Sequence, residues 1–167
     1  MSFVAHRTAA DDPAAFKATF GRFATGVSVV TCAPKDEAPR AVTISALASV
    51  SLDPALAMFC LEERAIVLSA ILRAGHFALN ILAEDQSDLS NLYSVEHEIR
   101  ADHETEVWES GAPIFRRALS IADCELLDTF GGGDHVILMG RVLEVGHRDD
   151  AAPLVYYGGG YGKFSKL

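Results

Sequence analysis

Residues 41–51 read AVTISALASVS, a stretch in which apolar residues alternate with small hydroxyl-bearing ones and nearly every side chain is small. This alternation is typical of a strand with one buried face. A strand of small side chains offers a flat surface, so a planar ring could lie close to its backbone. A half-buried strand packed against a helix accounts for the same composition, and the stretch alone does not decide between the two.

On both sides of this stretch the chain is predicted to form short strands. They are bounded by turn residues such as Gly26, Pro34 and the pair Asp53 and Pro54. The predicted strands are VSVVTC (27–32), RAVTIS (40–45), SVSL (49–52), LAMFCL (56–61), HFALNIL (76–82), ALSIADCELL (118–127), HVILMGRVLEV (135–145) and PLVYY (153–157). We therefore expect a mostly β protein.

Three segments predict helices. The first has Asp12 as its cap, Pro13 at its first position, an apolar face of Phe16, Phe20 and Phe23, and Gly26 as its end. The second covers 64–75 and ends at Gly75, and a short third one starts near Asp85. Residues 94–111 are polar and predict no regular structure. The whole pattern favours a closed or split antiparallel barrel with attached helices, in one domain over 1–167 with 1–10 as a flexible extension.

Composition excludes several classes of function. The chain has 14 Lys and Arg against 23 Asp and Glu, a formal net charge of −9, which disfavours nucleic acid as a partner. No apolar segment is long enough to span a membrane, and the N-terminus lacks a signal-peptide core, so we expect a cytoplasmic protein. There is no G-x-G-x-x-G, P-loop, H-E-x-x-H or G-x-S-x-G motif.

The cysteines and histidines do not predict a metal site. Cys32, Cys60 and Cys124 lie far apart in apolar runs and are expected to be small core residues. His97 and His103 stand six residues apart, on different faces of a helix, so a solvated polar segment is the simpler interpretation.

Three further segments are candidates for binding. GGGDH (131–135) places His135 next to Asp134 at a strand start, where it is a titratable group or simply part of a hairpin turn. Arg64 opens the second helix, a position that suits a phosphate or a surface ion pair. YYGGGYGKF (156–164) is a mobile tail or a set of tyrosines that stack on a ring.

Five blocks in this order resemble the short-chain flavin reductase family, the reductase partners of two-component flavin-dependent monooxygenases. The blocks are FGRFATGVSVVT (20–31), VTISALASVSLDP (42–54), FALNILAEDQ (77–86), GGDHVILMGRV (132–142) and PLVYYGGGY (153–161). The resemblance covers residues 16–164. It implies an FMN-binding split barrel, usually a homodimer, that uses NADH or NADPH to reduce FMN or FAD and releases reduced flavin to a separate monooxygenase.

The resemblance also assigns roles to residues. His135 would face the nicotinamide and position it, and it would take part in protonation around the flavin. The flavin-binding positions are Thr43, Ile44, Ser45 and Ala46 at the isoalloxazine with Ser49 and Val50 behind them, Cys60, Leu61 and Arg64 at the phosphate, Phe77, Asn80 and Gln86 on a further flavin-side segment, and Asp134 and Tyr161 at the mouth.

The sequence departs from the family pattern at two of these positions. Ile44 stands where the family usually has Ala, and Cys60 stands where it often has a hydroxyl residue, so the choice between FMN and FAD stays open. Residues 94–109 lack the usual Asp-Arg-Phe pattern, and no role is transferred there. Two alternatives share the barrel: a non-catalytic flavin- or haem-binding module, and an FMN oxidase of the pyridoxamine-phosphate type, which would need a basic substrate site that the sequence does not show.

Overall fold

A computed structural model describes residues 11–166, which form three helices and twelve strands. The predicted flexible extension, 1–10, lies outside these residues. The helices are α1 (Pro13–Phe20), α2 (Ile66–Ala74) and α3 (Ser87–Tyr93). The strands are β1 (Thr25–Gly26), β2 (Ser28–Cys32), β3 (Arg40–Ile44), β4 (Leu47–Leu52), β5 (Ala55–Glu62), β6 (His76–Ile81), β7 (Thr105–Val107), β8 (Pro113–Phe115), β9 (Ser120–Gly132), β10 (His135–His147), β11 (Leu154–Tyr157) and β12 (Gly160–Lys163).

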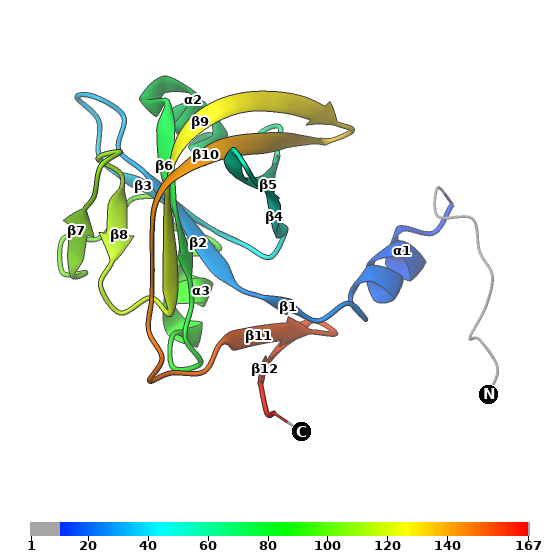
Figure 1. Ribbon diagram of the computed structural model, residues 1–167. Helices are drawn as coiled ribbons and strands as arrows, with labels where there is room; N and C mark the ends of the chain where they lie inside the picture. The colour runs from blue at the N-terminus through cyan, green and yellow to red at the C-terminus, as the bar shows by residue number, and fades with distance from the viewer. Residues whose placement is uncertain (1–10, 167) are drawn as a thin grey trace.

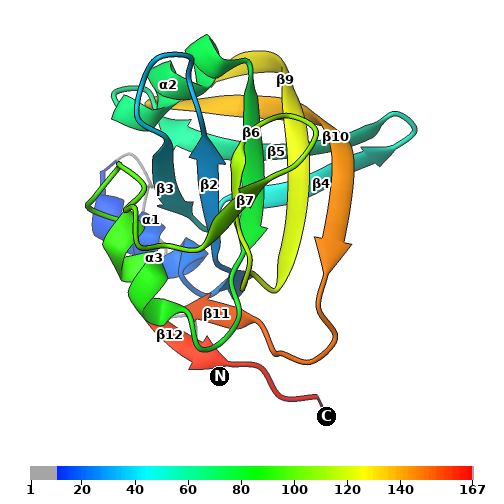
Figure 2. The same ribbon diagram turned by 90° about the vertical axis from the view of Figure 1, so that its left-hand side faces the viewer.

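The main sheet has seven antiparallel strands in the order β3-β2-β6-β9-β10-β5-β4. Its two edge strands, β3 and β4, are consecutive in the chain and are joined only by Ser45 and Ala46, so the sheet curls back on itself. In Figure 2 β5 and β4 cross behind the strands that face the viewer. This arrangement confirms the predicted mostly β architecture, an open barrel with attached helices.

The long β9–β10 hairpin holds the two halves of the barrel together. The N-terminal half of β9, away from the hairpin turn, pairs with β6. The N-terminal half of β10, next to the turn, pairs with β5 (Figure 1). The register shifts between Met139 and Gly140 and again between Val142 and Glu144. Such bulges increase the local bend of a strand pair, so one hairpin can follow the curvature of the barrel.

Strand β2 and helix α2 lie in the core, and their apolar side chains explain why both are buried. All five residues of β2 are buried, which requires the β-branched and small residues that it contains. Helix α2 buries Val67, Leu68, Ala70 and Ile71 and ends at Gly75, whose φ of 71° is the left-handed conformation that favours glycine. Cys32 and Cys124 are fully buried, as predicted, whereas Cys60 is only partly buried.

Helix α1 stands apart from the sheet, and none of its residues is buried (Figure 1). It starts as predicted, with Asp12 capping and Pro13 first, but it ends at Phe20 instead of Gly26. The prediction was wrong at that end because Thr25 and Gly26 form β1 and pair with β11. The apolar side chains of this segment consequently remain exposed, by 50% for Phe16 and 63% for Phe20.

Residues 94–111 are more ordered than predicted. Thr105–Val107 forms β7 and pairs with β8. The buried Asp123 accepts hydrogen bonds from the amide N–H of Ser110 (2.7 Å) and from its hydroxyl (2.5 Å). These contacts connect residues distant in sequence, which local polarity does not reveal. Within residues 11–166, no helix is both long and apolar enough to cross a bilayer.

Candidate functional site

The link between the two edge strands forms an exposed ledge of small residues. Ser45 and Ala46 are exposed, and the Ala46 carbonyl accepts a hydrogen bond from the Cys60 amide at 3.2 Å. Thr43 is held from behind, because its hydroxyl donates to the Ser90 carbonyl of α3 at 2.7 Å. Ile44 points the other way, into the core, and is only 7% exposed. The larger side chain at position 44 therefore does not stand on the exposed surface of the ledge.

A groove of about 680 Å³ lies on one side of the ledge, between the barrel and the segment that follows α1. Its lining is mainly apolar and contains several small residues. The lining residues are Phe20, Phe23, Ala24, Thr25, Gly26, Ser28, Ser45, Ala46, Leu47, Ala48, Met58, Cys60 and Ile81. A groove of this size and composition can hold the apolar part of a planar ligand.

A second, more polar cavity of about 430 Å³ lies on the other side, and Ser45 lines both. Its walls come from the ledge, from α3 and from the β11–β12 hairpin. The Tyr161 hydroxyl donates to Asn91 Oδ1 at 2.9 Å and lies 2.8 Å from Ser90 Oγ. The lining residues are Val27, Thr43, Ile44, Ser45, Ser90, Asn91, Ser94, Tyr156, Gly159, Gly160 and Tyr161.

His135 is the first residue of β10 and lies beside the C-terminal end of β5. Its side chain is on the same face of the sheet as that of Cys60. His135 pairs with Glu62 across the two strands, and side chains two residues apart on one strand share a face. The His135 Nδ1 atom is 2.7 Å from Asp134 Oδ1. This hydrogen bond is the main cause of the lowered pKa of the Asp134 carboxyl. In the tautomer with hydrogen on Nδ1, Nε2 is an acceptor.

Arg64 lies in the turn before α2, in a small cavity of about 390 Å³ that it shares with three carboxylates. Its side chain is 90% exposed, and its Nε donates to Glu62 Oε2 at 3.1 Å. Glu63 and Asp134 complete the cavity, and the Glu63 amide donates to the Asp134 carbonyl at 3.0 Å. One guanidinium therefore faces an excess of negative charge.

Four of the predicted site residues are buried away from both cavities. Leu61 and Phe77 belong to the main core. The Asn80 amide donates to the Val29 carbonyl at 3.0 Å, and its Oδ1 accepts from the Phe115 amide at 2.8 Å. Asn80 thus joins β2, β6 and β8 in the interior and lines no cavity described above.

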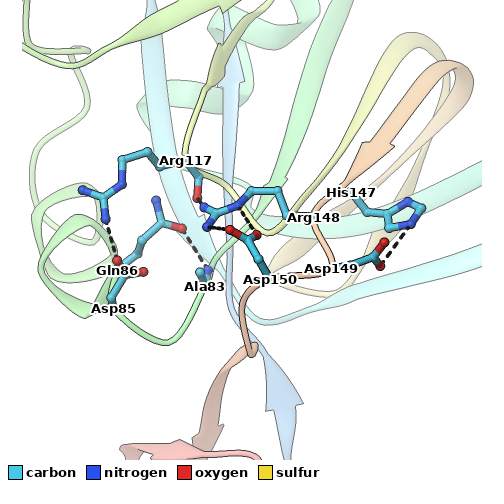
Figure 3. Close-up of polar contacts among 8 residues, drawn as sticks. All are labelled: Ala83, Asp85, Gln86, Arg117, His147, Arg148, Asp149 and Asp150. Carbon is cyan, nitrogen blue, oxygen red and sulfur yellow. Dashed lines mark hydrogen bonds and ion pairs between the residues drawn. The ribbon is translucent and has the colours of Figure 1, made fainter.

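Gln86 is the fourth of these residues, and it has a structural contact of its own. Its Oε1 accepts the Ala83 amide at 2.8 Å, which closes the turn before α3 (Figure 3). Beside it, Arg117 pairs with Asp85 at 2.6 Å on the surface. Ser49 and Val50, in contrast, are exposed on the edge strand β4 beyond the groove lining.

Several residues that line the cavities were not predicted from the sequence. Thr25, Met58, Ser90 and Asn91 line the two cavities, yet none belongs to a recognisable binding motif. The only local signal was on α3, where Ser90, Asn91 and Ser94 place polar groups on one helix face. Residues 11–166 contain no group of three or more His, Cys, Asp or Glu side chains arranged to hold a metal ion.

Comparison with known proteins gives a consistent result. A family model described as a flavin reductase like domain matches residues 20–165. An FMN reductase (NADH), SmoA, of Agrobacterium fabrum is 36% identical over 151 residues, covering 90% of this chain and 86% of the relative. The reductase component of a 4-nitrophenol 4-monooxygenase/4-nitrocatechol 2-monooxygenase from Rhodococcus opacus is 33% identical, covering 92% and 82%.

Solved structures agree with these sequence relatives. BorF, the flavin reductase component of a bacterial two-component tryptophan halogenase, superposes with a TM-score of 0.85 at 32% identity, covering 93% of this chain and all of BorF. The NADH:FAD oxidoreductase SgcE6 of Streptomyces globisporus superposes with a TM-score of 0.89 at 26% identity, covering 96% and 98%.

Proposed function

The chain belongs to the family of flavin reductase-like domains, and on this basis we propose that it is an oxidoreductase that uses NADH to reduce FMN or FAD. We also propose that the reduced flavin leaves the protein and is consumed by a separate flavin-dependent monooxygenase. Relatives that are named as reductase components of two-component systems support this second step.

The observation that carries the proposal is the ledge at Ser45 and Ala46 with a cavity on each side. A flavin ring is apolar at its dimethylbenzene end and polar at its pyrimidine end, and it is flat. The groove is mainly apolar, whereas the second cavity has hydroxyl and amide groups from Thr43, Ser90 and Asn91. A ring that lies against the ledge would therefore place each end in a matching environment.

The flavin supplies the redox chemistry when bound, and the chain supplies binding and orientation. We assign to His135 the task of orienting the nicotinamide over the ring. Asp134 contacts the imidazole at Nδ1, so in the tautomer with hydrogen on that atom Nε2 can accept a hydrogen bond from the nicotinamide carboxamide. Holding two reacting rings in contact accounts for much of the barrier lowering in such a transfer.

Arg64 remains our proposed ligand of the flavin phosphate. Its side chain is exposed and can exchange Glu62 for a phosphate, because surface ion pairs are weak. The neighbouring carboxylates of Glu63 and Asp134 reduce the attraction of this corner for an anion. We therefore expect weak phosphate anchoring, which suits a flavin that is released after reduction.

We further propose that the protein acts as a homodimer. The apolar side chains of Phe16, Phe20 and Phe23 on and after α1 are at least half exposed in the single chain, and Phe23 is 74% exposed. Exposed apolar surface that adjoins a binding groove is typical of an interface. A second copy covering this segment would close the groove beside the ledge.

The test is anaerobic reduction of free flavin by the purified protein. NADH is added to FMN or FAD, and the loss of flavin absorbance is followed with native and with heat-denatured protein. We expect reduction only with native protein, at a rate proportional to its concentration. Absence of reduction with both flavins at high concentrations of NADH and of NADPH would contradict the proposal. A Soret band in the protein as isolated would favour a haem-binding module instead.

A further inference from the structure

The β11–β12 hairpin forms one wall of the polar cavity, and it contacts the main sheet mainly at its base. There the Leu154 amide donates to the Leu82 carbonyl at 3.0 Å, and the Glu84 amide donates to the Ala152 carbonyl at 2.8 Å. Every residue from 156 to 166 is exposed. Beyond its base the hairpin pairs only with the two-residue strand β1, so further contacts are needed to fix its position beside α3.

Tyr161 provides such contacts through a directional chain of hydrogen bonds. Its single hydroxyl hydrogen is donated to Asn91 Oδ1 at 2.9 Å. The Ser90 hydroxyl, 2.8 Å away, must then be the donor in the second bond. The chain therefore runs from Ser90 Oγ through the Tyr161 hydroxyl to Asn91, and both partners belong to α3.

One of these two residues, Ser90, also contacts the ledge. The Ser90 backbone carbonyl accepts the Thr43 hydroxyl at 2.7 Å, while the Ser90 side chain contacts Tyr161. Ser90 is completely buried, so its position is fixed by packing. One rigid residue thus holds both the ledge and the aromatic ring that faces the cavity, and it sets the distance between them.

We propose that Ser90 and Asn91 are positioning residues, which hold the Tyr161 ring over the polar cavity so that it packs on a bound planar heteroaromatic ring. This inference rests on the proposed function, since the ring is the isoalloxazine of the flavin or the nicotinamide of NADH. Neither α3 residue needs to take part in the chemistry. Their effect is to pre-organise one wall of the site before the ligand arrives.

The test compares Tyr161→Phe, Ser90→Ala and Asn91→Ala with the native protein. Flavin affinity is measured by titration without NADH, and KM for NADH and kcat are measured at saturating flavin. We expect each variant to weaken the binding of one of the two ligands by about three- to tenfold, the effect of one or two hydrogen bonds, and to change kcat less than about twofold. The ligand whose binding changes is the one that contacts Tyr161.

Two further variants separate positioning from general damage. Asn91→Asp keeps an acceptor for the Tyr161 hydroxyl, so its binding defect is expected to be smaller than that of Asn91→Ala. Ser69→Ala removes an exposed hydroxyl of α2 that lies outside both cavities and donates to the Ile66 carbonyl, and it is expected to be silent. Asn91 is exposed, so its variants should fold even if a change at the buried Ser90 is poorly tolerated.

The double variant Ser90→Ala, Tyr161→Phe tests whether the two residues act through the same contact. If Ser90 acts through Tyr161, the binding defect of the double variant equals that of Tyr161→Phe alone. Multiplied defects, or full binding in Tyr161→Phe and Asn91→Ala, would overturn the inference while native flavin reduction leaves the proposed function standing. Failure of the native protein to reduce flavin would instead remove the proposed function itself.

Discussion

Replacing Gly140 by alanine should test how tightly the barrel interior is packed. Gly140 is buried in β10, at the first of the two bulges. A Cβ atom at this position would lie 2.3 Å from Cζ of Phe77 and 3.1 Å from Cβ of Cys124. Phe77 has no room to retreat, because it is completely buried and packs edge-on against Phe59, with 5.0 Å between the ring centroids.

The expected cost follows from this overlap. Extra atoms in a well-packed core destabilise by about 1 to 3 kcal/mol. For a protein of this size that corresponds to a fall in Tm of about 2 to 12 °C. The assay is urea or thermal unfolding followed by circular dichroism, without flavin and at a fixed protein concentration, since ligand and subunit binding would both shift the transition.

Two variants sharpen this prediction. In Gly131→Ala, on the same hairpin, the new Cβ meets no atom within 4 Å, so stability should stay unchanged or rise by up to about 1 kcal/mol. Combining Gly140→Ala with Phe77→Leu should recover part of the loss, because the smaller side chain makes room. If Gly140→Ala is as stable as the native protein while Gly131→Ala is not, the packing argument is refuted.

Three further results are expected. His135→Ala should raise KM for NADH by about tenfold and leave flavin affinity nearly unchanged, and equal loss of both in steady-state and binding assays would remove its proposed role. Asn80→Ala should cost about 2 to 4 kcal/mol in chemical unfolding, because a buried carbonyl and a buried amide lose their partner, yet flavin affinity of the folded protein should persist. A thiol reagent should modify Cys60 quickly, and more slowly when flavin is bound. Burial raises the pKa of Cys32 and Cys124 to about 12, so both should react only after unfolding. Rapid reaction of all three thiols would contradict this expectation.

The raised pKa of the two buried thiols also fixes the sign of an alkaline effect. The unfolded chain loses these protons first, near pH 9, while the folded chain keeps them until about pH 12. The corresponding stability is therefore fully present below pH 9 and is lost as the pH rises toward 12.

The sequence predicted the strands of the main sheet because their pattern is local, whereas β1, β7, β8 and β12 were not predicted. The alternation around Ser45 and the turn at Asp53 and Pro54 mark β3, β4 and β5 within one or two residues. The end of α1 was misplaced because the pairing of β1 with β11 joins residues about 130 positions apart, and helix propensity contains no information about such a partner. β7 was missed for another reason: its partner β8 is near in the chain, but β7 itself lies in a polar segment with no strand pattern.

The candidate site was predictable only in part. The small residues Ser45 and Ala46 are exposed beside a groove, and His135 contacts Asp134, but neither His135 nor Asp134 lines the groove or the polar cavity. Motif position could not show that Asn80 and Gln86 turn their amides toward the backbone. Nor could it show Ser90, whose importance comes from two long-range hydrogen bonds that no pattern along the chain encodes.

The groove and the polar cavity each have one wall from the barrel and an opposite wall that includes residues of the small sheet β1-β11-β12. The two walls differ greatly in local stability. The barrel wall carries long hydrogen-bonded ladders between β9, β10, β5 and β6, and its amide protons should exchange with deuterium only over long times. The opposite wall consists of a two-residue strand and a short hairpin, whose amides should exchange early. A reduced flavin can thus depart by brief opening of the side that exchanges early, and the barrel never has to unfold to release it.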